Sequence, residues 1–181
     1  MSNKLKDFLK GKLTQKEIFL VPSSFDMVGD LIIFSDFPEE LSKKEKIIGE
    51  AILRNFKHIK SVFKKTKKYS GIYRVPKLKL IAGDVRKDTE HKENNTRIRL
   101  NVEKVYFSPR LSEERKRIFS QVKTGEVVLV MFSGSGVYPI TIAKNSNVKE
   151  VYGIEINPIA HKYALENIRL NKLEDKVKLF F

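Results

Sequence analysis

The sequence predicts an α/β protein in which a small basic α+β module, residues 1–109, precedes the first part of a Rossmann-like domain, residues 110–181. Three apolar segments, at residues 126–132, 150–156 and 176–181, alternate with helical patterns, which is typical of a doubly wound parallel sheet. A Ser-Gly-Ser-Gly turn follows the first of these segments, at the place where such folds bring backbone close to a ligand.

The first module is expected to mix helices with short strands. Apolar residues at near-helical spacing predict a helix within residues 1–20, and Pro38 is a permissible start for a second helix over residues 38–56. We expect a turn at Gly29-Asp30 leading into a strand, and further strands at residues 61–65 and 77–83. Residues 90–107 predict a hairpin that turns around Asn94-Asn95.

The second module follows a β-α-β-α-β pattern after a leading helix. That helix is expected over residues 112–122, with Ser112 as its N-cap. Helices around residues 138–146 and 157–173 then separate the three apolar strands. Neither an internal repeat nor a flexible linker is evident in the sequence.

The charge balance favours a polyanionic partner. The chain has 36 Lys and Arg residues against 22 Asp and Glu, a net charge of +14. Neutralising phosphates releases their counterions, so this balance favours nucleic acid, with a generally lysine-rich proteome as the alternative. No apolar run approaches the roughly 20 residues of a membrane span. The absence of cysteine excludes disulfides and Cys-based zinc sites, and we expect a cytoplasmic protein without a metal.

The basic residues are concentrated between residues 51 and 83, which contain no Asp or Glu. Phe63, Tyr69 and Tyr73 lie among them and are suited to stacking on unpaired bases. The residues that we expect to contact RNA are Lys64, Lys65, Lys67, Lys68 and Arg110.

The glycine turn indicates a nucleoside ligand without a pyrophosphate. Residues 132–136 read Phe-Ser-Gly-Ser-Gly, but Pro139 breaks the dinucleotide pattern and no P-loop Gly-Lys follows. Glu155 ends the next strand, where an acid can accept hydrogen bonds from ribose hydroxyls. This combination suits S-adenosylmethionine (SAM); the alternative is a turn with a purely structural role.

Together these segments resemble the archaeal and eukaryotic tRNA (guanine-37-N1)-methyltransferases. The resemblance rests on "KVYFSPRLSEERKRI", the glycine turn, "VYGIEINPIAHKYALENIRLNKL" and, upstream, "DMVGDLIIF", "GIYRVPKLKLIAGD" and "EHKENN". It covers the chain from about residue 20 onward. It implies a class I SAM-dependent methyltransferase domain, a tRNA substrate and methyl transfer to N1 of the guanine next to the anticodon.

The resemblance also implies roles for individual residues. Glu114 would be the general base that removes the N1 proton, and Arg74 would stabilise negative charge at guanine O6. The implied cofactor contacts are Arg115, Phe132, Ser133, Gly134, Gly136, Glu155 and Ile156. His91 and His161 are expected to be polar surface residues rather than catalysts.

The chain also departs from the family pattern. Val130 stands where the family usually has Asp, and Val137 stands where the family tends to have Pro. The family's later strands and its Asn-Leu/Pro-Pro-Lys motif are not in the sequence, so we expect an incomplete sheet, little turnover from this chain alone and completion by a second polypeptide. Two other functions stay open: a non-catalytic RNA-binding remnant, and the related wybutosine-pathway aminocarboxypropyl transferase.

Overall fold

The computed structural model describes the backbone of residues 2–181 and the side chains of these residues except 2–4 and 68. The chain divides into two compact units. The first comprises the residues up to 69 together with 76–87, and the second comprises residues 70–75 and 88–181. The division thus falls ahead of the hairpin, whereas the sequence suggested a boundary after it, at residue 109.

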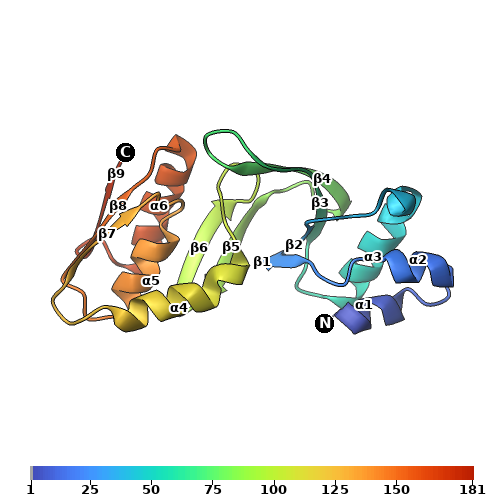
Figure 1. The fold of residues 1–181 in the computed structure, drawn as a ribbon, viewed down its shortest axis with the longest axis horizontal. Helices are drawn as coiled ribbons and strands as arrows, with labels where there is room; N and C mark the ends of the chain where they lie inside the picture. The colour runs from blue at the N-terminus through green and yellow to red at the C-terminus, as the bar shows by residue number, and fades with distance from the viewer. Residues whose placement is uncertain (1) are drawn as a thin grey trace. The chain divides into compact units, whose positions relative to one another are not determined.

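The first unit packs helices on a four-stranded sheet of order β1-β2-β3-β4 (Figure 1). β1 and β2 form an antiparallel pair around the expected turn, and β2 runs parallel to β3. Its elements are α1 (Ser2–Phe8), α2 (Gln15–Leu20), β1 (Asp26–Val28), β2 (Leu31–Phe34), η1 (Glu39–Lys44), α3 (Glu45–Asn55), β3 (Ser61–Ser70) and β4 (Val75–Gly83).

Two expectations for the first unit need correction in detail. The helix expected over residues 38–56 opens with a 3-10 segment, η1, before α3 begins. The expected N-terminal helix is divided into α1 and α2, and Thr14 caps α2 in a capping box with Glu17. Leu5, Leu9 and Leu13 are nevertheless buried, in one core with Ile48 and Ile52 of α3.

The second unit follows the predicted order of strands and helices. Its elements are β5 (Asp88–Glu93), β6 (Thr96–Asn101), η2 (Pro109–Leu111), α4 (Ser112–Gln121), β7 (Val127–Met131), α5 (Val137–Asn145), β8 (Glu150–Ile154), α6 (Pro158–Asn171) and β9 (Val177–Phe180). Ser112 is not the N-cap of α4: the cap position is Leu111, and the Ser112 carbonyl and hydroxyl accept hydrogen bonds from Asn94. The 3-10 turn η2 leads directly into the helix and takes the place of a side-chain cap.

A parallel sheet of order β7-β8-β9 forms one layer of the second unit. Each helix between its strands is a crossover, and two right-handed crossovers in the same direction lie on the same face of the sheet. Figure 1 shows α5 and α6 on that face, with the β5–β6 hairpin beyond them as a third layer. The Rossmann-like class predicted from the sequence is confirmed.

Two asparagines of α6 join the hairpin to the rest of the second unit. The Asn167 carboxamide accepts a hydrogen bond from Arg99 N–H at 2.7 Å and donates one to Arg99 C=O at 2.9 Å. Asn171 does the same with Arg97, at 3.0 and 2.7 Å. Four residues of helix rise about 6 Å and two residues of strand about 6.7 Å, so the two spacings match. The helix therefore satisfies the backbone edge of β6 and holds the hairpin in this unit.

The face of the sheet opposite α5 and α6 has an exposed apolar part, beside an ion pair between Glu150 and Lys178. Val127, Leu129 and Met131 of β7 are 55%, 59% and 53% exposed, and Phe180 of β9 is 53% exposed. Within the described residues β7 has one strand neighbour, β8. The predicted half-covered sheet is thus present, and such a face is typical of a protein-interaction surface. No helix of the described chain is long and apolar enough to cross a membrane.

Candidate functional site

The turn after β7 is held in a left-handed conformation. Phe132, Gly134 and Gly136 have φ angles of 57°, 58° and 81°. Ser133 N–H donates to the Ile154 carbonyl at 2.9 Å, which ties the turn to the end of β8. A Cβ atom on Gly136 would lie 3.1 Å from the Ala164 Cβ, so α6 passes close behind the turn. The glycines therefore allow both the backbone conformation and the close packing.

The Glu155 carboxylate lies against this turn. Its Oε2 accepts the Gly134 N–H and its Oε1 accepts the Asn157 N–H, both at 2.7 Å. The side chain is 8% exposed, so its position is fixed from both sides. Each carboxylate oxygen can accept further hydrogen bonds, which leaves capacity for hydroxyl groups of a ligand.

A pocket of about 530 Å³ opens beside Glu155 and the turn. Its lining residues are Ile72, Tyr73, Arg74, Tyr106, Phe132, Gly134, Glu155, Ile156, Asn157 and Ala160. All of them belong to the second unit, including residues 72–74 from the loop between β3 and β4. Phe132, Ile72 and Ile156 are 81%, 79% and 61% exposed, so apolar surface is available to a flat ligand.

The pocket gathers five of the predicted site residues. Arg74, Phe132, Gly134, Glu155 and Ile156 line it. Ser133 and Gly136 are buried and shape the turn without lining the pocket. Sequence reasoning missed Ile72, Tyr106, Asn157 and Ala160, and it named Tyr73 only as an aromatic suited to stacking on bases. The position of Tyr106 within the quoted Tyr-Phe-Ser-Pro-Arg-Leu block was a usable signal, and so was Asn157 beside Glu155.

Arg115 is buried in an ion pair and does not line the pocket. Its guanidinium donates two hydrogen bonds to Glu93 and one to the Ser108 carbonyl at 3.1 Å. The rings of Phe107 and Tyr138 lie 5.4 and 5.7 Å from the guanidinium carbon. Arg115 therefore connects α4 to the hairpin, and direct cofactor contact stays a prediction from the family resemblance.

His91 completes this buried cluster. Its Nε2 lies 3.4 Å from the Glu93 carboxylate, and its ring packs edge-on against Phe107. Burial by itself would raise the pKa of Glu93, but hydrogen bonds from His91 and Arg115 and their charges hold that pKa below its ordinary value. The cluster thus stabilises the ionised form of Glu93.

Glu114 lies in the first turn of α4 and is paired with Arg117. Arg117 Nε donates to Oε2 and Nη2 donates to Oε1, both at 2.7 Å. The two side chains are 41% and 54% exposed. The hydrogen bonds from Arg117 hold the pKa of Glu114 below its ordinary range, so the carboxylate is ionised. Glu114 is not among the residues that line the pocket.

The predicted RNA contacts differ in their surroundings. The amine of Lys64 lies 2.6 Å from Glu45, and the Lys65 side chain is 9% exposed, with its amine 4.0 Å from Asp26. Lys67 and Arg110 are exposed. The side chain of Lys68 lies outside the described part of the structure. Lys64 and Lys65 are thus largely covered and paired within the protein, and the side chains of Lys67 and Arg110 are exposed to solvent.

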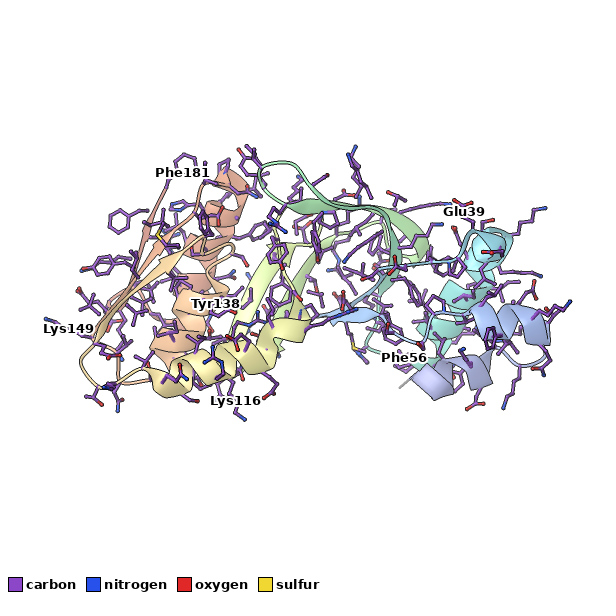
Figure 2. All side chains as sticks on the ribbon, in the orientation of Figure 1. Glu39, Phe56, Lys116, Tyr138, Lys149 and Phe181 are labelled. Atoms are coloured by element: carbon purple, nitrogen blue, oxygen red, sulfur yellow. The ribbon has the colours of Figure 1, made fainter. Side chains whose placement is uncertain are left out.

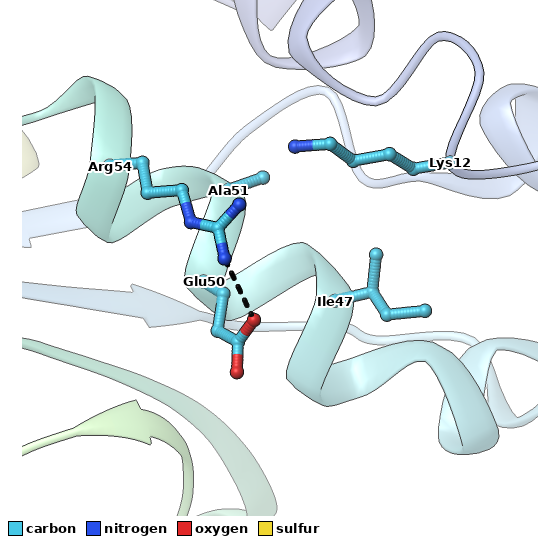
Figure 3. A pocket seen from close by; sticks show the side chains of 5 residues that line it. All are labelled: Lys12, Ile47, Glu50, Ala51 and Arg54. Atoms are coloured by element: carbon cyan, nitrogen blue, oxygen red, sulfur yellow. Dashed lines mark ion pairs between the residues drawn. The ribbon is translucent and has the colours of Figure 1, made fainter.

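A second hollow, of about 330 Å³, lies in the first unit (Figure 3). Lys12, Ile47, Glu50, Ala51 and Arg54 line it, and Arg54 is paired with Glu50 at 3.6 Å. It lacks the glycine turn and the buried carboxylate of the pocket at Glu155. Among the described residues no group of three His, Cys, Asp or Glu side chains is placed to hold a metal ion.

Comparison with known proteins identifies the family. The TRM5/TYW2 methyltransferase domain matches residues 89–180, and the TYW2 N-terminal domain matches residues 5–87. The chain belongs to the TRM5/TYW2 methyltransferase family. The two matched regions meet at the same place as the two compact units.

Its relatives include tRNA-modifying enzymes. A tRNA (guanine(37)-N(1))-methyltransferase, Trm5b of Pyrococcus abyssi, is 45% identical over 159 residues, which are 88% of this chain and 47% of that protein. The solved complex of aTrm5 and tRNALeu superposes with a TM-score of 0.84 at 38% identity, over 97% of this chain and 52% of that one. TYW2 of P. horikoshii in complex with MeSAdo superposes with a TM-score of 0.79 at 28% identity, over 99% and 63%. The chain thus spans about half the length of the first two of these relatives.

Proposed function

We propose that the protein takes part in SAM-dependent methylation of guanine N1 at position 37 of tRNA. The observation that carries this proposal is the meeting of Glu155, Gly134 and Arg74 in one pocket. A ribose-binding acid and a close backbone turn suit the cofactor, and a cation in the same pocket suits the base that receives the methyl group. Because the substrate is tRNA, we also expect a cytoplasmic protein.

The residues of the pocket fit an adenosyl group. The Glu155 carboxylate would accept the two ribose hydroxyls, because each of its oxygens has capacity beyond its backbone donor. Phe132 and Ile156 would flank the adenine with their exposed apolar surface. The open backbone at Gly134 permits close approach. When bound, SAM supplies a methyl group on a sulfonium centre.

Two further side chains are proposed to act on the guanine. The Glu114 carboxylate would accept the N1 proton of the guanine as N1 receives the methyl group. The Arg74 guanidinium would stabilise the negative charge that develops at O6. Arg74 has a φ of 49°, an uncommon conformation for a residue other than glycine, and it lines the pocket from the loop between β3 and β4.

Aminocarboxypropyl transfer is the second candidate function. The match of residues 5–87 to the TYW2 N-terminal domain and the superposition on TYW2 structures favour it. Both reactions would use the same pocket and the same cofactor, and they differ in which group leaves the sulfonium. The pocket residues alone therefore support both chemistries.

We also propose that a further polypeptide segment covers the exposed face of the β7–β9 sheet. The segment would add a strand beside β7 and lay an apolar helix over Val127, Leu129 and Met131, as the second face of a doubly wound sheet requires. The relatives support this proposal because they are about twice as long as this chain. Such a segment would complete the catalytic domain.

The decisive experiment combines this chain with the C-terminal half of the Pyrococcus abyssi relative, supplied as a separate polypeptide. Mixtures would receive a tRNA transcript with guanine at position 37 and SAM labelled either in the methyl group or in the carboxyl carbon. Methyl label in N1-methylguanosine supports the methyltransferase, and carboxyl label in the RNA supports the second candidate. Calorimetric titration of SAM into this chain would report the cofactor site without turnover.

The controls distinguish failure of the two polypeptides to associate from absence of the proposed activity. Leu129→Lys should abolish association with the added half while leaving SAM binding to this chain unchanged. If the assembly forms, binds tRNA in a salt-sensitive manner and transfers neither label, the enzyme proposal fails and the RNA-binding remnant replaces it.

A further inference from the structure

The Glu114 carboxylate, which the proposed reaction needs as its general base, is engaged in an ion pair with Arg117. Both oxygens of Glu114 accept hydrogen bonds from one guanidinium, in a two-point arrangement at 2.7 Å each. A carboxylate in this arrangement is held in the plane of the guanidinium. Each oxygen keeps a further lone pair, but the guanidinium stabilises the ionised carboxylate and so weakens Glu114 as a proton acceptor.

The pair is also placed where it can be exchanged. Both side chains are about half exposed, and an exposed ion pair contributes little to stability, so separating the two groups is inexpensive. The buried Arg115–Glu93 pair fixes the neighbouring residue of α4, at 2% and 4% exposure. The helix itself is therefore held in place while the Arg117 side chain can change partner.

An RNA phosphate is the natural competing partner. Guanidinium binds phosphate in the same two-point geometry that it uses for carboxylate. Arg117 lies one helical turn from Glu114, about 4.5 Å along the axis. If Glu114 serves the target base, the phosphates next to that base pass close to α4, which also presents Lys116 to solvent (Figure 2).

We propose that Arg117 holds Glu114 in a two-point ion pair until an RNA phosphodiester takes the guanidinium, so that the carboxylate becomes an effective general base only with RNA in place. This inference rests on the proposed role of Glu114. It makes Arg117 a positioning residue that senses the substrate, and it gives the exposed pair a function beyond helix stability.

Several charged or titratable groups lie near Glu114, and each could affect a measurement of its pKa. The charged group that faces it on its own helix is Arg117. From α5 the phenol of Tyr138 lies within electrostatic reach, and burial raises the pKa of that phenol. Arg115, Glu93 and Tyr106 act on the same phenol. Changes that RNA causes in these groups must be distinguished from loss of the Arg117 contact.

The test is an NMR titration of the Glu114 carboxyl carbon, assigned with Glu114→Gln, in this chain with and without an anticodon stem-loop RNA. Free protein should show a lowered pKa for Glu114, and Arg117→Ala should raise that pKa. With RNA bound, wild type and Arg117→Ala should converge. Lys116→Ala removes the same charge from the next position and should leave the wild-type pattern intact. Inorganic phosphate in place of RNA should not produce convergence, because it lacks the placement that the bound chain imposes.

Two results would overturn the inference: a difference between wild type and Arg117→Ala that persists in the RNA complex, or convergence with inorganic phosphate alone. Failure of the proposed function would look different. There, the completed assembly would transfer neither label to tRNA, whatever the titration shows, whereas wild-type methyl transfer by Glu114→Gln would remove only Glu114 from the mechanism.

Discussion

Arg115 of α4 donates two hydrogen bonds to Glu93 at the end of β5, and both side chains are almost fully buried. The pair joins a helix to a hairpin across 22 residues of sequence. Phe107 and Tyr138 cover the guanidinium, and His91 contacts the carboxylate. This ion pair therefore holds α4, the helix that carries Glu114, against the hairpin. Its loss should lower the free energy of unfolding.

Glu93→Gln should lower the free energy of unfolding by about 3–5 kcal/mol at neutral pH, because it leaves a buried guanidinium without its counter-charge. Urea denaturation measures this change. Arg117→Gln, which breaks the exposed pair on the same helix, should have a much smaller effect. If both variants lost the same free energy of unfolding, the buried pair would contribute no more to stability than the exposed pair.

The same pair predicts a pH dependence. The pKa of Glu93 is lower in the folded protein than in the unfolded chain. Its contribution to stability is therefore fully present above the unfolded value of about 4.3 and is lost as the pH falls through the folded value. Unfolding midpoints between pH 2 and pH 6 should fall more steeply for wild type than for Glu93→Gln; parallel curves would contradict this assignment.

Asn167→Ala should destabilise the second unit by about 2 kcal/mol or more, since each buried polar group left without a partner costs about 1–3 kcal/mol. The change removes the partners of the Arg99 N–H and C=O and of the Ser135 carbonyl. Hydrogen exchange should show the largest loss of protection at the Arg99 amide, with a smaller loss at Arg97, whose acceptor Asn171 remains. Glu166→Ala, one residue earlier and exposed, should leave the Arg99 amide protected.

Glu155→Gln should weaken SAM binding by about tenfold to a hundredfold, the loss expected for a hydrogen bond to a charged group. The substitution replaces one carboxylate oxygen with an NH2 group, which cannot accept the hydrogen bond from the Gly134 or Asn157 N–H. Calorimetry measures the affinity. Glu150→Gln, at the start of the strand β8 that precedes Glu155 and paired with Lys178, is the matched control and should bind as wild type. Unchanged affinity in Glu155→Gln would remove this carboxylate from the proposed site.

Alanine substitutions at Lys67 and Lys65 should affect different properties: RNA binding at Lys67 and stability at Lys65. Lys67→Ala should weaken RNA binding and reduce the slope of log affinity against log salt by about 1, as expected for one lost phosphate contact. Lys65→Ala should chiefly lower stability, because its amine contacts Asp26, Ser35 and Tyr69. Filter binding at several salt concentrations, beside thermal unfolding, separates the two. A change in salt slope for Lys65→Ala alone would reverse the assignment.

The sequence predicted those features that depend on neighbours along the chain. Apolar runs of strand length and the helices between them predicted the β7–β9 sheet, and the glycine turn predicted where the pocket lies. Glu155 could be chosen because the end of the second strand has a fixed place beside that turn. These are local patterns with one dominant physical cause each.

The features that escaped prediction depend on distant partners. The Glu93–Arg115 pair and the Asn167–Arg99 contact bring together residues 22 and 68 positions apart, and no local pattern in a single sequence specifies them. Lys64 and Lys65 belong to a run that has no acid of its own, but Glu45 and Asp26 reach them from other elements. A cluster of cations in sequence therefore overstated the accessible positive charge.

The asparagine contacts of α6 have a consequence for the order of folding. β6 is complete at residue 101, yet the side chains that satisfy its edge are at positions 167 and 171. During synthesis about 70 further residues must therefore be added after β6 before α6 can cover the open edge of the hairpin. At about 5–20 residues per second this interval lasts several seconds, long compared with the microseconds in which a hairpin forms. The nascent chain is then most exposed to strand-to-strand aggregation, and chaperone protection would matter most in that interval.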